Sequence, residues 1–98
     1  MKKHICIYTT KEVLDHKQMD GYCYWQFANR PKIIDEWEKD EDMELRLYVA
    51  INKFIQGYFV VDMFRDNNQL DFDGDTWVDI KFTPQVQFQG FKYIEEIK

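Results

Sequence analysis

Two hydrophobic segments joined by a short polar link occupy residues 45–64, which read LRLYVAINKFIQGYFVVDMF. In the first segment every second residue is hydrophobic and would lie on one face of a strand; these residues are Leu45, Leu47, Val49 and Ile51. The second segment is rich in residues that favour β-strands, and we expect this strand to begin at the flexible Gly57. Asn52-Lys53 is a weak turn signal alone, but segments this close in sequence usually pair. We therefore predict two neighbouring strands.

Further short strands are predicted on both sides of this pair, because their residues are β-branched or alternate between hydrophobic and polar. The strand that follows the turn at Gly21 has one clearly apolar face, formed by Cys23, Trp25 and Phe27. Residues 65–75 are predicted to be a polar, turn-rich loop. The additional extended segments are 3–8, 22–27, 76–82 and 85–89, and residues 91–94 are either one more extended piece or a short terminal turn.

Two short helices are also predicted. Thr9 and Glu12 stand at the spacing of a capping box, so a helix should follow them and end near Lys17. Asn29 can cap the second helix, and Pro31 is tolerated in its first turn. The residues that would form an apolar stripe on this second helix are Ile33, Ile34 and Trp37.

The length and composition are those of one folded unit. Ninety-eight residues with 45% hydrophobic content leave no room for two independent cores, so we assign residues 1–98 to a single domain. Strands outnumber helices and are not each followed by one, which argues against a doubly wound fold. The predicted class is α+β, mostly β: a small, partly open β-barrel of five or six strands with two short flanking helices.

The negative charge of the chain is concentrated in one segment. The formal net charge is −5, and residues 35–44 hold seven acids against Lys39, a local charge of −6. This segment is either a solvated helix end and loop or an acidic surface that binds a basic protein partner or occupies a nucleic-acid site. An acidic chain is a poor nonspecific DNA binder, but it can still hold a local basic pocket that reads one base.

No apolar run approaches the roughly 18 residues needed to cross a bilayer, and the first residues turn polar too early for a signal peptide. We therefore expect a cytoplasmic protein with no membrane partner. Cys6 and Cys23 are then expected to be reduced, and their Ile and Tyr neighbours favour two small buried side chains over a redox or metal pair.

Most catalytic and metal-binding patterns are missing from the sequence. The chain has no serine, and His4 and His16 follow no metal-ligand spacing, so both are interpreted as surface histidines. Residues 71–75 resemble part of a calcium loop, but the carboxylates required at both ends are missing, which favours a hairpin turn at Asp73-Gly74. We assign no catalytic residue, no metal and no cofactor.

Aromatic, amide and basic side chains lie close together in the sequence between residues 22 and 37. Aromatic faces stack on bases, amides read base edges and cations hold phosphates, so these residue types suit one nucleotide or a single strand. Trp25 and Trp37 fall on apolar faces and are better explained as core. The members that packing explains least are Tyr24, Gln26 and Arg30.

Three features follow one another along the chain: a glycine turn into a strand that ends near an arginine (21–30), a hydrophobic strand and then a hydrophobic-x-Gly-x-hydrophobic strand (47–61), and a closing segment (88–94). This order resembles the PUA-like superfamily, particularly its ASCH and EVE-like members. The resemblance implies a small, partly open β-barrel with flanking helices and a cleft that holds RNA, a modified base or a nucleoside. It carries over Arg30, aided by Lys32, as a candidate ligand contact.

Some small ASCH proteins are similar to amidohydrolases that act on acylated cytidine and use a lysine and a threonine in a Gly-x-Lys-Thr entrance. Here Gly21 is followed by Tyr22-Cys23-Tyr24, so both residues are missing. The leading hypothesis is therefore a binding module for RNA, a modified base or a nucleotide-derived ligand. In this hypothesis Tyr24 stacks on a base, Gln26 hydrogen-bonds to the edge of a base, and Arg30 with Lys32 contacts an anionic group of the ligand. The alternatives are an acidic protein-interaction or inhibitor protein and a nucleoside amidohydrolase-like enzyme.

Overall fold

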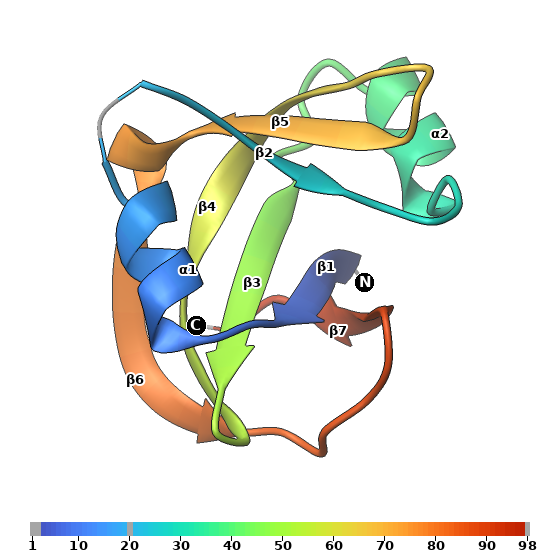
Figure 1. Ribbon diagram of the computed structural model, residues 1–98. Helices are drawn as coiled ribbons and strands as arrows, with labels where there is room; N and C mark the ends of the chain where they lie inside the picture. Colours follow the sequence, from blue (N-terminus) through green and yellow to red (C-terminus); the bar gives the residue numbers. More distant parts are fainter. Residues whose placement is uncertain (1–2, 20, 98) are drawn as a thin grey trace.

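The predicted strand pair at residues 45–64 forms the centre of the sheet (Figure 1). In the computed structural model, which describes residues 3–19 and 21–97, β3 (Arg46–Ile51) pairs antiparallel with β4 (Phe54–Phe64). Only Asn52 and Lys53 form the turn, with φ values of 50° and 70°. A two-residue turn with both φ values positive is of type I′, whose twist matches the flanking strands. The predicted neighbouring strands are confirmed.

Gly57 lies inside β4 and not at its start, as the sequence had suggested. A Cβ atom at this position would stand 2.3 Å from the carbonyl oxygen of Val78 and 2.6 Å from the ring of Trp77. The register of β4 also shifts here against both β3 and β6 (Val78–Pro84). Glycine is therefore required because another strand approaches the backbone closely, and not because the strand begins there.

The strands form one mixed sheet in the order β2-β5-β4-β3-β1-β7, and β6 pairs with the first half of β4. The parallel pair is β1 with β3, and the other pairs are antiparallel. The sheet curls but does not close, so that β2 and β7 end on opposite edges of an open seam (Figure 1). The remaining bounds are β1 Lys3–Tyr8, β2 Tyr22–Gln26, β5 Gln69–Asp73 and β7 Phe91–Glu95.

The mostly β, α+β class is confirmed, but the described residues form seven strands and not five or six. The extra strand is β5, inside the segment predicted to be a loop, where it pairs with both β2 and β4. The predicted hairpin turn at Asp73-Gly74 is wrong, because a short 3-10 helix, η1 (Gly74–Thr76), follows β5. The strand predicted at 85–89 is also absent, since those residues have no ladder partner and carry no regular structure.

Both predicted short helices are present, with different N-terminal caps. In α1 (Lys11–Lys17) the hydroxyl of Thr10, not Thr9, accepts the N–H of Val13 at 3.3 Å. In α2 (Ile33–Lys39) the cap position is Lys32, not Asn29, and it makes no side-chain capping bond. The apolar stripe of α2 is confirmed, because Ile33 and Ile34 are buried and Trp37 packs against the core.

The main hydrophobic core lies inside the curl of the sheet, beneath both helices. Phe59 of β4 is the largest fully buried side chain of this core. The centroid of its ring lies 4.4 Å from that of Phe72 and 4.8 Å from that of Trp77. A second, smaller cluster packs around Tyr48 on the other face of β1 and β3. The main cluster comprises Ile5, Ile7, Leu14, Phe27, Ile33, Ile34, Leu45, Leu47, Val49, Phe59, Val61, Phe64, Leu70 and Phe72.

Candidate ligand site at the open seam

The four residues singled out in the sequence occupy two places. Tyr24 and Gln26 lie on the outer, solvent-facing side of β2, as the alternation predicts. Arg30 and Lys32 lie in the segment between β2 and α2. Gln26 stands where these two places meet, because it is the last residue of β2 and lines a cavity at the seam.

The charge of Arg30 is taken up within the molecule. Its guanidinium donates to Asp35 at 3.0 Å and to Glu38, and it lies 5.3 Å from the centre of the Phe64 ring. These carboxylates belong to the acidic segment 35–44, so part of that segment serves as the counter-charge of Arg30. Hydrogen bonding to Asp35 raises the pKa of Arg30, which stays charged. The positive charge offered to an external anion at this point is therefore small.

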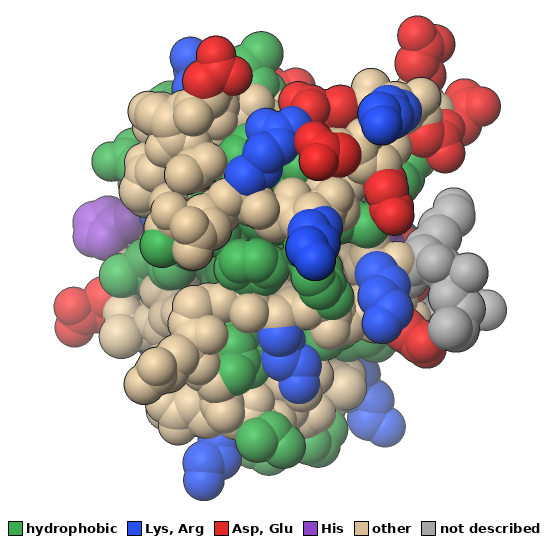
Figure 2. Space-filling view, turned by 90° about the vertical axis from the view of Figure 1, so that its right-hand side faces the viewer, with side chains coloured by type: hydrophobic (Ala, Val, Ile, Leu, Met, Phe, Trp, Pro, Cys, Tyr) green, Lys and Arg blue, Asp and Glu red, His purple; other side chains and the backbone are tan. Residues whose placement is uncertain are grey.

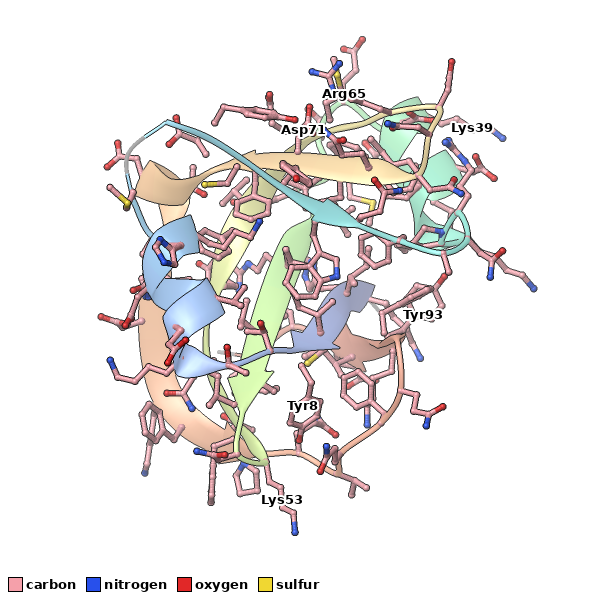
Figure 3. All side chains as sticks on the ribbon, in the orientation of Figure 1. Tyr8, Lys39, Lys53, Arg65, Asp71 and Tyr93 are labelled. Carbon is pink, nitrogen blue, oxygen red and sulfur yellow. The ribbon has the colours of Figure 1, made fainter. Side chains whose placement is uncertain are left out.

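The seam is bridged by contacts between the end of β2 and β7. The rings of Phe27 and Phe91 meet edge to face at 5.3 Å, and the hydroxyl of Tyr93 accepts the backbone N–H of Lys32 at 2.7 Å. Figure 3 shows Tyr93 beside the segment that follows β2. In Figure 2, which faces this side, a band of hydrophobic side chains crosses the middle with Lys and Arg on both sides of it. Asp and Glu gather over the upper part of that face.

One cavity at the seam combines amides with aromatic rings. It has a volume of about 240 Å³ and lies between residues 25–29 and residues 89–91. Among the described residues, the side-chain amides of Asn29 and Gln89 form no hydrogen bond. The side-chain amide of Gln26, in contrast, donates to the backbone carbonyl of Asn67 at 2.6 Å. The lining side chains that carry chemistry are Trp25, Gln26, Phe27, Asn29, Gln89 and Phe91.

A larger hollow of about 570 Å³ lies beside this cavity, under α2. Its apolar floor comes from Ile33, Met43 and Tyr93. Its rim carries both signs of charge, with lysines at 3 and 32 and carboxylates at 36, 40 and 42. Lys32 and carboxylates of the acidic segment therefore line the same hollow, whose Tyr93 ring contacts the Phe91 ring of the amide-lined cavity at 5.5 Å between centroids.

The outer face of β2 and β5 carries an aromatic pair above a buried carboxylate. Tyr22 and Tyr24 are exposed, whereas Asp71 of β5 is 3% exposed. Desolvation works against the charged form of Asp71, but hydrogen bonds from Gln69, Arg65 and Tyr22 outweigh it and lower the pKa of the carboxyl group. Desolvation and the same carboxylate raise the pKa of Tyr22, which keeps its proton.

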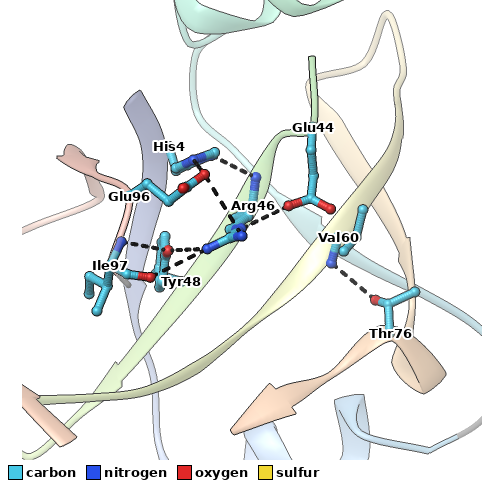
Figure 4. A network of polar contacts seen from close by, with 8 residues as sticks. All are labelled: His4, Glu44, Arg46, Tyr48, Val60, Thr76, Glu96 and Ile97. Atoms are coloured by element: carbon cyan, nitrogen blue, oxygen red, sulfur yellow. Dashed lines mark hydrogen bonds and ion pairs between the residues drawn. The ribbon is translucent and has the colours of Figure 1, made fainter. Parts of the chain in front are cut away.

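His4 is not a surface histidine, as the sequence had suggested, but a fully buried one (Figure 4). Its Nδ1 accepts the backbone N–H of Arg46 at 3.0 Å, and its Nε2 lies 3.4 Å from a carboxylate oxygen of Glu96. Burial lowers the pKa of His4, which stays neutral in this cluster. Arg46 continues the cluster to Glu44 at 2.8 Å and to the hydroxyl of Tyr48 at 2.9 Å. These contacts join β1, β3 and residues 96–97, and we assign them to stability.

The two cysteines and the calcium-like segment 71–75 lie outside the seam cavity. Cys6 is fully buried, which raises the pKa of its thiol to about 12, and Cys23 is half-buried; both are free. Within residues 3–19 and 21–97, no group of three or more His, Cys, Asp or Glu side chains is arranged to hold a metal ion. In that same part of the chain, no helix has the length and apolar character needed to cross a membrane.

Comparison with family models, with curated proteins and with solved structures finds no match to this chain. The candidate site therefore rests on its own geometry. Sequence reasoning named Gln26 and Lys32 but missed Gln89 and Phe91 as lining residues. The only signal for these two was the break at Gly90, which has a φ of 72° and turns the chain into β7 beside the end of β2.

Proposed function

We propose that this protein is a small binding module for a nucleobase, carried by RNA or by a modified nucleotide or nucleoside, and that the amide-lined cavity at the seam receives the base. The observation that carries the proposal is the meeting of carboxamides and aromatic rings in one cavity between β2 and β7. A curled, unclosed sheet with a ligand cleft is also what the PUA-like resemblance implies.

The lining has the donors and acceptors that a base edge requires. A carboxamide offers an acceptor oxygen and two N–H donors, and paired contacts from Asn or Gln to one base discriminate by about 1–3 kcal/mol. Asn29 and Gln89 line the cavity from different segments of the chain, so under this proposal a flat ring can receive contacts from both amides. Trp25 and Phe91 supply ring surface for stacking.

The charges near the cavity favour a ligand with few phosphates. Lys32 lines the neighbouring hollow, but Arg30 is paired with Asp35 and Glu38, and the chain is acidic as a whole. Long-range attraction of a polyanion is therefore weak, and specificity must come from base contacts. Under this proposal Lys32, whose side chain forms no ion pair with a described residue, contacts a phosphate or ribose that projects from the cavity.

Titration followed by tryptophan fluorescence tests the proposal, because Trp25 lines the cavity. The ligands are adenosine, cytidine, guanosine, uridine, a set of base-modified nucleosides and the four RNA homotetranucleotides. At least one should bind with a micromolar Kd, and Asn29→Ala or Gln89→Ala should weaken that binding about tenfold. Gln56→Ala is the matched control, since this glutamine bonds to its own strand and turn away from the seam. Flat titrations across all ligands would refute the proposal.

A basic protein partner is the second candidate function, favoured by the hollow under α2. Three carboxylates rim an apolar floor there, which suits a lysine- or arginine-rich segment with a hydrophobic anchor. Glu36→Lys with Asp40→Lys should abolish the binding of a fluorescent lysine-leucine peptide. Reversal of Glu12 and Asp15, two exposed acids of α1 that do not line the hollow, should leave it unchanged. If the two pairs of substitutions act alike, the hollow is not the partner site.

A further inference from the structure

Two exposed tyrosine rings lie side by side on β2, outside the seam cavity. Tyr22 and Tyr24 are 61% and 46% exposed, their ring centroids are 6.2 Å apart, and their planes differ by 27°. Neither ring belongs to the hydrophobic core. Open aromatic surface of this kind is suited to stacking against a flat ligand.

The ring of Tyr22 is held in place by hydrogen bonds to neighbouring polar side chains. The hydroxyl of Tyr22 donates to the carboxylate of Asp71 at 3.0 Å and accepts from the amide of Gln69. Arg65 donates to the other carboxylate oxygen at 2.6 Å (Figure 3). Because Asp71 is almost fully buried, its position is fixed by packing, and its hydrogen bond holds the hydroxyl end of the Tyr22 ring before any ligand arrives.

Two cations flank the tyrosine pair. The Nζ atom of Lys17 lies 4.7 Å from the centre of the Tyr24 ring and donates to the Tyr24 carbonyl oxygen. Arg65 is half-exposed on the side of Tyr22. In the described part of the β2–β5 pair, Asp73 is an exposed acid opposite Tyr22, and its Oδ1 accepts the backbone N–H groups of Gly21 and Asp75. Phosphates are therefore tolerated beside Tyr24 and disfavoured beyond Tyr22.

The tyrosine pair is continuous with the seam cavity along β2. Tyr22, Tyr24 and Gln26 occupy every second position of one strand face, at intervals of about 6.6 Å. Gln26 also lines the cavity. A ligand that emerges from the cavity along this face therefore meets Tyr24 first, then Tyr22, and then the carboxylate of Asp73.

We propose that the ligand is a short single-stranded oligonucleotide and not an isolated nucleoside. One base enters the seam cavity, the adjoining bases stack on Tyr24 and Tyr22, and Lys17 contacts the phosphate between them. This inference rests on the proposed function, because it extends the same site along β2. The open tyrosine pair has no enclosing wall that would retain a small molecule, so it contributes only when the ligand is also held at the seam.

The test compares nucleosides with tetranucleotides of the same base in equilibrium titrations. The tetranucleotide should bind at least about tenfold more tightly than its nucleoside, and Tyr24→Ala should remove that gain while leaving the nucleoside Kd within about twofold. Tyr24→Phe keeps the ring face and should retain the gain. Phe82→Ala removes an exposed aromatic ring from β6, 62% exposed against 46% for Tyr24, and should change neither Kd. Circular dichroism confirms that each variant is folded.

The outcomes separate this inference from the proposed function. If tetranucleotides bind no more tightly than nucleosides, or if Tyr24→Ala weakens both equally, the strand path along β2 is refuted and the base pocket stands. If tetranucleotides bind through Tyr24 but Asn29→Ala and Gln89→Ala have no effect, the path stands and the cavity is not the base pocket. If neither class of ligand binds, both proposals are refuted.

Discussion

Two polar clusters of similar make-up lie in opposite surroundings. Each joins an arginine, a tyrosine and a buried titratable group: Arg46, Tyr48 and His4 in one, and Arg65, Tyr22 and Asp71 in the other. In the first cluster the tyrosine is fully buried and the arginine side chain is 17% exposed. In the second these groups are 61% and 51% exposed. The same combination of residue types therefore joins segments of the chain in the buried cluster, whereas in the surface cluster it exposes a tyrosine and an arginine to solvent.

The largest difference between the clusters should appear when each arginine is removed. Arg46→Ala deprives Glu44, Glu96 and the hydroxyl of Tyr48 of their shared partner and strips the contact with the ring of Tyr58, which lies 4.2 Å away. Arg46 is 17% exposed, but Glu44 and Glu96 are 49% and 31% exposed and partly solvated, so a loss of about 2 kcal/mol in the free energy of unfolding is expected. Urea denaturation monitored by circular dichroism measures it.

Arg65→Ala is the matched change in the surface cluster. Asp71 keeps the hydrogen bonds from Tyr22 and Gln69, so the loss should be about 1 kcal/mol. Equal losses in the two variants would show that burial does not separate the clusters.

Removal of each tyrosine hydroxyl should give a smaller effect in the same direction. Tyr48→Phe leaves the backbone N–H of Ile97 and one N–H of Arg46 without their acceptor, at a cost of about 1.5 kcal/mol. Tyr22→Phe leaves Asp71 with two donors and an exposed ring in place, so about 0.5 kcal/mol is expected. Thermal unfolding of both variants provides the measurement. A larger shift in Tm for Tyr22→Phe would contradict the comparison.

The smallest effects should be seen in the pH dependence of stability, where the clusters respond in different ranges. The pKa of His4 is lowered by burial, so His4 stabilises the fold above its ordinary value of 6.5 and this contribution is lost as the pH falls below it. The neighbouring charges are Glu96, Arg46 and Glu44. The pKa of Asp71 is lowered from 3.8 despite desolvation, so its contribution persists to more acidic pH and is lost only below that value.

Two substitutions test which residue causes the loss of stability in each pH range. His4→Gln should flatten the stability profile as the pH falls below about 6.5, whereas Asp71→Asn should flatten it only below about pH 4. The free energy of unfolding from urea titrations at a series of pH values measures both profiles. A His4→Gln variant whose stability still falls over the first range would show that another group is responsible.

Much of the fold was predictable from local pattern. The hydrophobic alternation at 45–51 and the stripe of Ile33, Ile34 and Trp37 each place a buried face correctly, because the period of side-chain direction is a property of the backbone. Strand β5 was missed because Asp71 reads as a loop residue until Tyr22, Gln69 and Arg65 are brought over it. The alternation at 85–89 misled for the opposite reason, since no strand lies beside those residues to receive their hydrogen bonds.

The candidate site was predictable only along one strand. That Tyr24 and Gln26 share an outward face follows from their spacing alone. That Arg30 is paired with Asp35 and Glu38 depends on how α2 packs, and that Gln89 and Phe91 complete a cavity depends on β7 returning to the end of β2.

Side-chain period, turn chemistry and total hydrophobic content are local or additive properties, and they settle the class of the fold and the buried faces of its elements. Which strands become neighbours, which charges find partners and where the curled sheet stays open are set by contacts between residues distant in sequence. The energy of such a contact depends on what the rest of the chain places beside it. His4 shows this most directly, because a histidine that any local pattern would put at the surface is buried and neutral under residues 46 and 96.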